Sequence, residues 1–192
     1  MARTSGSTGY GVYEGGGIWL GSGNFLLRNV LLDNNIGGGI YVAASGALAN
    51  GAPSSGLTLV ENVTSVTNNA VGIQVHATAA PRTTIRNAIA YENYVADMYG
   101  SLPATLEYNC IGDGTQDGIN NNFAADPLFV DAVGSDFRLS TDPLSPCINV
   151  GLNQSWMIGA EDLQGLPRIM AGTVDLGAYE SLPPSATLIL IR

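Results

Sequence analysis

Few side chains in this sequence could act as a catalytic base. The chain has one histidine, His76, and no lysine, against seven arginines. A polysaccharide lyase or epimerase needs a base to take a proton and a cation to neutralise the substrate carboxylate. His76 as the base and the nearby Arg82 as the neutralising cation are therefore the candidate catalytic pair. The alternative is that His76 is a loop residue at the edge of a strand.

Carboxylates are more numerous, but their spacing defines no centre. Glycoside hydrolysis needs two carboxylates several ångströms apart on one face. Asp97 has no such partner nearby unless the loop 113–117 supplies one. That loop, with Asp126 and Asp131, offers enough oxygen atoms for a structural calcium ion. The spacing matches no calcium motif, so a solvated acidic loop is the alternative. We predict no catalytic metal and no other cofactor.

The two cysteines, Cys110 and Cys147, allow either one disulfide or two buried thiols. Cys110 falls in a column of apolar residues that should face the core. Both alternatives stay open.

The segments that must position these residues are repeated. A Gly-Ile motif recurs with its central residue at Ile18, Ile40, Ile73 and, weakly, Met98. A second element carries an asparagine at Asn29, Asn62, Asn87 and Asn109. Each of the first three asparagines lies 11 residues before the next copy of the first motif. The reverse step varies in length, so the unit is about 22 residues and insertions fall at one corner.

Short β-branched segments with Gly and Asn between them predict an all-β parallel solenoid. Leucine-rich repeats have a similar period, but their leucine spacing and helical half are missing. Asparagine suits a stacked corner, because its amide donates and accepts hydrogen bonds and it tolerates left-handed backbone. We therefore expect an asparagine ladder; four independent turns are the alternative. Residues 1–114 should form about four coils and residues 115–192 an irregular closing region with an apolar tail, in the same domain.

Strand alternation places the residue that follows Ile18, Ile40, Ile73 and Met98 on the outer surface. These residues are Trp19, Tyr41, Gln74 and Tyr99. We predict that they form a ligand-binding row beside the inserted loop 43–56 and the loop at His76. The alternative is that the rings pack beneath those loops. A second outward column, before the asparagines, should pair opposite charges on neighbouring rungs. Its members are Arg28, Glu61, Arg86 and Tyr108.

Five segments after the repeats carry a family resemblance. They are Ala-Asp-Pro-Leu-Phe-Val-Asp (125–131), Asp-Phe-Arg-Leu (136–139), Ser-Pro-Cys-Ile-Asn-Val-Gly (145–151), Asp-Leu-Gln-Gly-Leu-Pro-Arg (162–168) and Val-Asp-Leu-Gly-Ala-Tyr-Glu (174–180). With the repeats, residues 15–181 resemble bacterial right-handed parallel β-helix repeat proteins of the pectin-lyase-like superfamily.

That resemblance implies a right-handed single-stranded parallel β-helix with an irregular C-terminal cap, an exported or surface protein, and association with polysaccharides. It implies no single activity. Asn149 and Gln164 stand where the family often has acidic residues, which weakens any transfer of a metal site.

The charge and hydropathy of the sequence exclude some classes of binding partner. A net charge of −9 and a pI near 4.2 argue against nucleic acid. No apolar run is long enough to span a membrane. We expect an extracellular or cell-surface module whose leader is not in this chain. It should be non-catalytic, bind glycans, and self-associate through exposed solenoid ends or the apolar tail 186–191. The alternative is a polysaccharide lyase or epimerase, or a piece of one.

Overall fold

Strands account for nearly all regular structure in residues 16–21, 23–43 and 56–182, which the computed structural model describes. The strands are β1 (Ile18–Leu20), β2 (Phe25–Asp33), β3 (Ile40–Val42), β4 (Thr58–Val66), β5 (Val71–Val75), β6 (Thr83–Arg86), β7 (Ile89–Tyr91), β8 (Ala96–Gly100), β9 (Thr105–Glu107), β10 (Cys110–Ile111), β11 (Phe129–Asp131) and β12 (Asp136–Leu139). Two single-turn 3-10 helices are η1 (Ala80–Arg82) and η2 (Ser155–Met157). No helix in this described part is long and apolar enough to cross a membrane.

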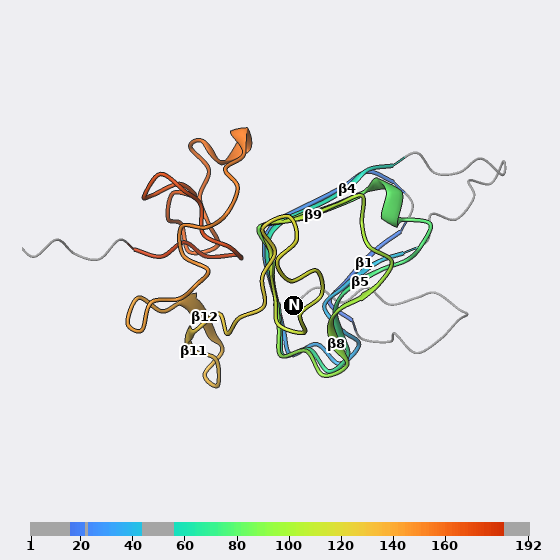
Figure 1. Cartoon of the computed structure of the whole chain (residues 1–192), viewed down its shortest axis with the longest axis horizontal. Coiled ribbons are helices and arrows are strands. Elements are labelled where there is room, and N and C mark those ends of the chain that lie inside the picture. The colour runs from blue at the N-terminus through green and yellow to red at the C-terminus, as the bar shows by residue number, and fades with distance from the viewer. Residues whose placement is uncertain (1–15, 22, 44–55, 183–192) are drawn as a thin grey trace, which may run out of the picture.

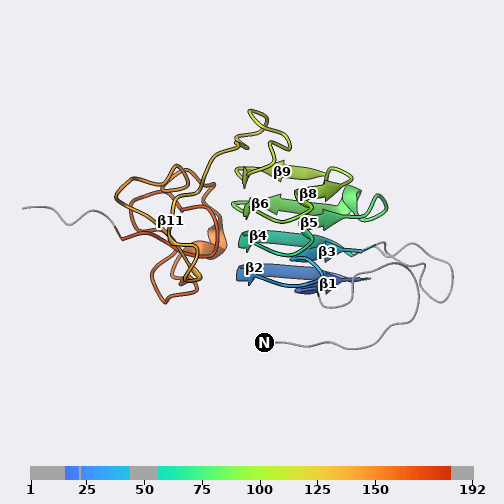
Figure 2. The ribbon, with the colours of Figure 1, turned by 90° about the horizontal axis from the view of Figure 1, so that it is seen from below.

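Strands β1 to β10 form two parallel sheets (Figure 1). Sheet A has the order β1-β3-β5-β8. Sheet B follows the path β10-β7-β4-β6-β9, and β2 also pairs with β4. Figure 2 shows the strands in stacked layers, which we call rungs; the described residues up to 123 are the stack.

This topology corrects the predicted fold class. A right-handed single-stranded parallel β-helix with an irregular cap is the wrong description, because the described strands form two parallel sheets in an open half-barrel and a separate antiparallel pair, β11 with β12. The reason lies in β4, which runs without a break through Asn62. One half of β4 pairs with β6 and the other half with β7, so the residues before and after the predicted asparagine corner share one sheet.

The position of the C-terminal region is also corrected. Residues 124–182, which we call the C-terminal lobe, lie beside the stack rather than over its last rung (Figures 1 and 2). The lobe contacts three successive rungs, as the hydrogen bonds described below show.

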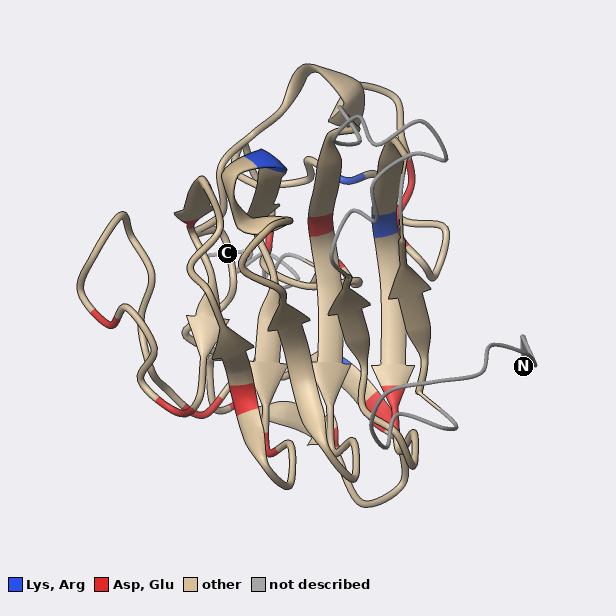
Figure 3. Ribbon diagram, turned by 90° about the vertical axis from the view of Figure 1, so that its right-hand side faces the viewer, with Lys and Arg blue, Asp and Glu red and all other residues tan. Residues whose placement is uncertain are grey.

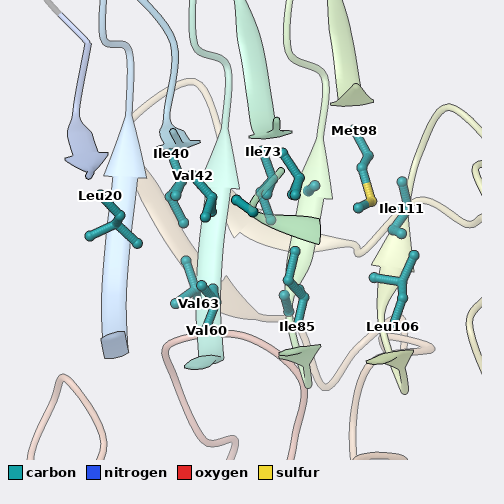
Figure 4. Packing of buried hydrophobic residues seen from close by; sticks show 14 of the residues in the cluster. Leu20, Ile40, Val42, Val60, Val63, Ile73, Ile85, Met98, Leu106 and Ile111 are labelled. Carbon is teal, nitrogen blue, oxygen red and sulfur yellow. The ribbon is translucent and has the colours of Figure 1, made fainter. Parts of the chain in front are cut away.

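The apolar core fills the space between sheets A and B (Figure 4). Ile40, Val42 and Ile73 from sheet A meet Val60 and Ile85 from sheet B, and each is at most 2% exposed. Burial of such a side chain contributes roughly 1.5–3 kcal/mol. Because alternate residues of a strand face opposite sides, the residue between two core residues of sheet A must point outward.

Each of the first three rungs turns at two corners with left-handed backbone. At the first corner, positive φ falls at Asn29, Asn62, Asn87 and, in the last rung, Tyr108; at the second it falls at Asn34, Thr67 and Glu92. Asparagine adopts this conformation at low cost. The same spacing at both corners shows that the turns belong to one repeated shape.

In the predicted asparagine ladder, Asn87 Nδ2 donates to Asn62 Oδ1 at 3.4 Å, but the last residue of the ladder is one position out of place. The registers Arg86↔Glu107 and Ile89↔Cys110 place Tyr108, not Asn109, opposite Asn87. Asn109 instead turns inward, where its Oδ1 accepts a hydrogen bond from the Ala88 amide at 2.8 Å.

The same shift changes the predicted charge column. Glu61 is 3% exposed, and its carboxylate lies 2.7 Å from Arg28 Nε and 3.5 Å from Arg86 Nε. Arg86 also pairs with Glu107 at 3.5 Å, so Glu107 takes the place predicted for Tyr108. Opposite charges on neighbouring rungs therefore support one another.

A buried amide ladder at the second corner is absent from the sequence prediction. Asn35 Nδ2 donates to Asn68 Oδ1, and Asn68 Nδ2 donates to Asn93 Oδ1, both at 2.8 Å. Asn93 Nδ2 ends the ladder on Asp97 Oδ1, also at 2.8 Å. These asparagines lie six residues after Asn29, Asn62 and Asn87, and that repeated offset was the available signal.

The first-corner asparagines hold the C-terminal lobe. Asn29 Nδ2 donates to the Glu161 carbonyl (2.7 Å) and Asn62 Nδ2 to the Asp175 carbonyl (3.2 Å). Asn87 donates to the Leu152 carbonyl (3.0 Å) and accepts from its amide (2.7 Å). One corner amide on each of three rungs thus satisfies a backbone group of the lobe.

A buried ionic cluster organises the lobe. Arg168 is fully buried and lies 2.9 Å from Glu180, while Asp162 and Asp175 bind nearby backbone amides. Burial raises the pKa of Glu180 to about 8, although the positive charge of Arg168 opposes the shift. Burial also raises the pKa of Asp175. The cluster holds more carboxylates than cations, so its protonation is linked to stability.

Asn68→Ala should lower the free energy of unfolding by about 3 kcal/mol, because each hydrogen-bonding group left without a partner costs roughly 1 kcal/mol or more. Those groups are the Asn35 backbone amide, the Asn35 side-chain Nδ2 and the Leu32 carbonyl. Asn69→Ala is the matched control, since Asn69 is exposed and its backbone amide makes its bond to Asn35. Urea unfolding measures both, and equal losses would contradict the ladder.

Stability should fall as the pH rises from about 4.5 to about 8. The folded pKa of Glu180 is raised, so its contribution is full below the ordinary value of 4.5 and is lost through about 8. The slope from one such group reaches about 1.4 kcal/mol per pH unit. Glu180→Gln should flatten the profile of urea midpoints, whereas the exposed Glu161→Gln should leave it unchanged. A profile that Glu180→Gln does not alter would count against this assignment.

Candidate functional site

The four predicted row residues lie in one line across sheet A. Trp19 is the Cα partner of Tyr41, Tyr41 of Gln74, and Gln74 of Tyr99. Trp19 and Tyr99 are 65% and 59% exposed, while Tyr41 and Gln74 are half-buried. With neighbouring strands about 4.8 Å apart, the row is about 14 Å long. We call these four residues the aromatic row.

The orientation of Trp19 depends on a glycine. A Cβ added to Gly21 would overlap the six-membered ring of the Trp19 indole. The ring therefore lies over the chain at Gly21 rather than standing away from the sheet. Any larger residue at position 21 would displace it, so Gly21 helps to set the indole at the first rung.

The outer face of sheet A carries almost no charge. Its strands contain one acidic residue, Asp97, and no basic residue (Figure 3). Asp97 is 6% exposed and belongs to the second-corner ladder. Burial raises the pKa of Asp97, and hydrogen bonds from Asn93 oppose the shift. The row thus lies on a largely uncharged surface.

In the acidic loop after β10, the Asp113 carboxylate accepts hydrogen bonds from backbone amides. Asp113 Oδ2 accepts from the amides of Asp97 and Met98, both at 2.9 Å, and Oδ1 from that of Thr115. Burial tends to raise the pKa of Asp113, but these hydrogen bonds outweigh it and the pKa is lowered. Asp97 and Asp113 therefore already act as hydrogen-bond acceptors inside the fold, and their placement gives no support to a hydrolytic pair.

His76 and Arg82 meet at one threonine. His76 is exposed, and its Nδ1 accepts from the Thr78 amide at 3.3 Å and lies 3.1 Å from Thr78 Oγ1. Arg82 Nη2 donates to the Thr78 carbonyl at 3.5 Å. Because Nδ1 accepts, the neutral ring carries its proton on Nε2. For His76 to act as a base through Nδ1, the hydrogen bond from the Thr78 amide must break.

The other side chains considered as calcium ligands do not converge. Asp126 Oδ1 accepts from the Leu128 amide (2.8 Å), and Asp131 Oδ1 accepts from that of Gly134 (3.0 Å). Among the residues described, no three His, Cys, Asp or Glu side chains are grouped so as to hold a metal ion.

Cys110 and Cys147 are both free, fully buried thiols. They belong to a second apolar cluster, with Leu176, between β10 and the C-terminal lobe. A hydrogen bond with Cys110 and burial both raise the pKa of Cys147. The structure therefore contains two buried thiols in place of the disulfide alternative.

Other predicted features fall wholly or mostly outside the described residues. These are residues 1–14 of the predicted coil region, the inserted loop 43–56 and the tail 186–191. Self-association through the solenoid ends or the apolar tail stays a prediction.

Comparison with protein-family models, curated proteins and solved structures finds no match for this chain. The resemblance of residues 15–181 to the pectin-lyase-like superfamily thus stays a prediction based on the sequence motifs.

Proposed function

We propose that the protein is a non-catalytic extracellular or cell-surface module that binds a polysaccharide chain along the aromatic row. The observation that carries this proposal is that neighbouring strands of sheet A place four residues directly opposite one another: Trp19, Tyr41, Gln74 and Tyr99. A polysaccharide repeats along its length, and so does this row. Aromatic rings can contact the apolar faces of successive sugars, while the Gln74 amide can hydrogen-bond to hydroxyl groups.

The charge of the surface favours a neutral glycan. Acidic polysaccharides carry carboxylates that need cations, and the strands of sheet A contain none. The whole chain is also negatively charged, at −9, which repels a polyanion. A neutral polysaccharide has no carboxylates to pair and is not repelled by the negative charge of the protein.

The lyase or epimerase alternative receives less support. Its cation, Arg82, lies in η1 beyond the end of β5, and its base has Nδ1 occupied by Thr78. That chemistry would have to act at the edge of the row rather than over it.

The double variant Trp19→Ala/Tyr99→Ala should bind a neutral glucan or xylan at least tenfold more weakly than the parent, because a loss of about 1.4 kcal/mol corresponds to tenfold in Kd. Affinity electrophoresis and calorimetry measure this change. Tyr94→Ala is the matched control, since Tyr94 is an 81% exposed aromatic residue outside the row.

Equal binding by the double variant and the control, or no binding of any neutral glycan by the parent, would contradict the proposal. Release of unsaturated products from pectate or alginate, abolished by His76→Ala, would instead support the lyase alternative.

A further inference from the structure

A hollow of about 200 Å³ lies where the stack meets the C-terminal lobe. The stack contributes Tyr91 and Glu92 at the second corner, and the lobe contributes Asp126, Phe129 and Phe137. With Val66 and Thr67, which also line the hollow, the lining comes from three separate parts of the sequence, so no spacing pattern links it. The hollow lies apart from the aromatic row, which is on sheet A.

The hollow has a fixed aromatic wall. Phe129 and Phe137 pack edge to face, with ring centroids 5.2 Å apart and an interplanar angle of 89°. Phe137 is 2% exposed, which holds the pair in place. Tyr91 packs against the apolar cluster formed by Cys110 and its neighbours. Rings held in this way need no reordering when a ligand enters.

The rim of the hollow is negatively charged. Glu92 and Asp126 are both exposed, one on each side of the junction, and no basic residue lines the hollow. The Asp126 carboxylate is anchored, because its Oδ1 accepts from the Leu128 amide. The pKa of Tyr91 is raised by burial and then by the charges of Asp126 and Glu92.

We propose that this hollow binds a small organic cation, in which an ammonium group is attached to apolar carbon. Two carboxylates without a basic partner attract a cation, and aromatic faces stabilise ammonium groups within about 6 Å. The volume suits one such head group and is too small for a stretch of polysaccharide. This proposal does not depend on glycan binding by the aromatic row.

Choline is the probe, and its uncharged isostere 3,3-dimethylbutan-1-ol is the control ligand. The full chain is titrated with each, and binding is followed by calorimetry and by NMR shifts of the aromatic protons. We expect choline to bind at least fivefold more tightly than the alcohol, with an affinity that falls as salt is added, because the rim carboxylates are screened.

Two variants locate the site. Glu92→Gln/Asp126→Asn should weaken choline binding at least fivefold, and the amide side chain that replaces Asp126 keeps an oxygen for the Leu128 amide. Glu161→Gln removes an exposed carboxylate of the lobe outside the hollow and should bind as the parent does.

Equal affinity for choline and the alcohol in the parent protein would overturn the proposal whatever the variants do. Unchanged choline binding by the double variant would overturn it as well. If the double variant does not fold, Glu92→Gln alone decides. Among the described residues the Glu92 side chain makes no hydrogen bond that this change would remove. It should weaken choline binding at least twofold, and unchanged binding would overturn the proposal.

Discussion

Hydrogen bonding by buried asparagine side chains is the constraint on which this structure depends. A chain that turns twice in each rung exposes backbone groups at every corner, and those groups need partners once they are buried. Asn35, Asn68 and Asn93 supply partners at the second corner and bind to one another. At the first corner, Asn62 and the other corner asparagines turn their amides to the C-terminal lobe. One residue type therefore ties rung to rung and stack to lobe.

The alignment of the aromatic row is a consequence of that constraint. A shift of one residue between neighbouring strands would turn Tyr41 inward and a core residue such as Ile40 outward. The amide ladder opposes such a shift, because each asparagine fits only one neighbour on the next rung. The outer face of sheet A stays in line for the same reason that the core stays packed. Its lack of charge distinguishes it from the junction with the lobe, where Glu92 and Asp126 face a common hollow. The two surfaces suit ligands of different chemistry.

Local repetition in the sequence was enough to align the row, because Ile18, Ile40 and Ile73 share a motif that encodes strand alternation. It was not enough for the last rung, where Tyr108 takes the left-handed position although Asn109 matches the motif. The register of β9 and β10 decides between the two residues, and register depends on packing rather than on a local preference. The predicted fold class failed for a related reason. Whether β4 breaks at Asn62 or continues through it cannot be read from one asparagine, and the side-on position of the lobe rests on contacts between residues more than 100 positions apart, such as Asn62 with Asp175.

Hydrogen–deuterium exchange tests most directly whether the second-corner ladder sets the register of sheet A. In Asn68→Ala, the Asn35 amide loses its acceptor, and the amides of β3 and β5 should exchange at least tenfold faster than in Asn69→Ala, because the sheet opens locally at a lower free energy. Faster exchange confined to residue 68 and its chain neighbours, with β3 and β5 as protected as in the control, would contradict the account.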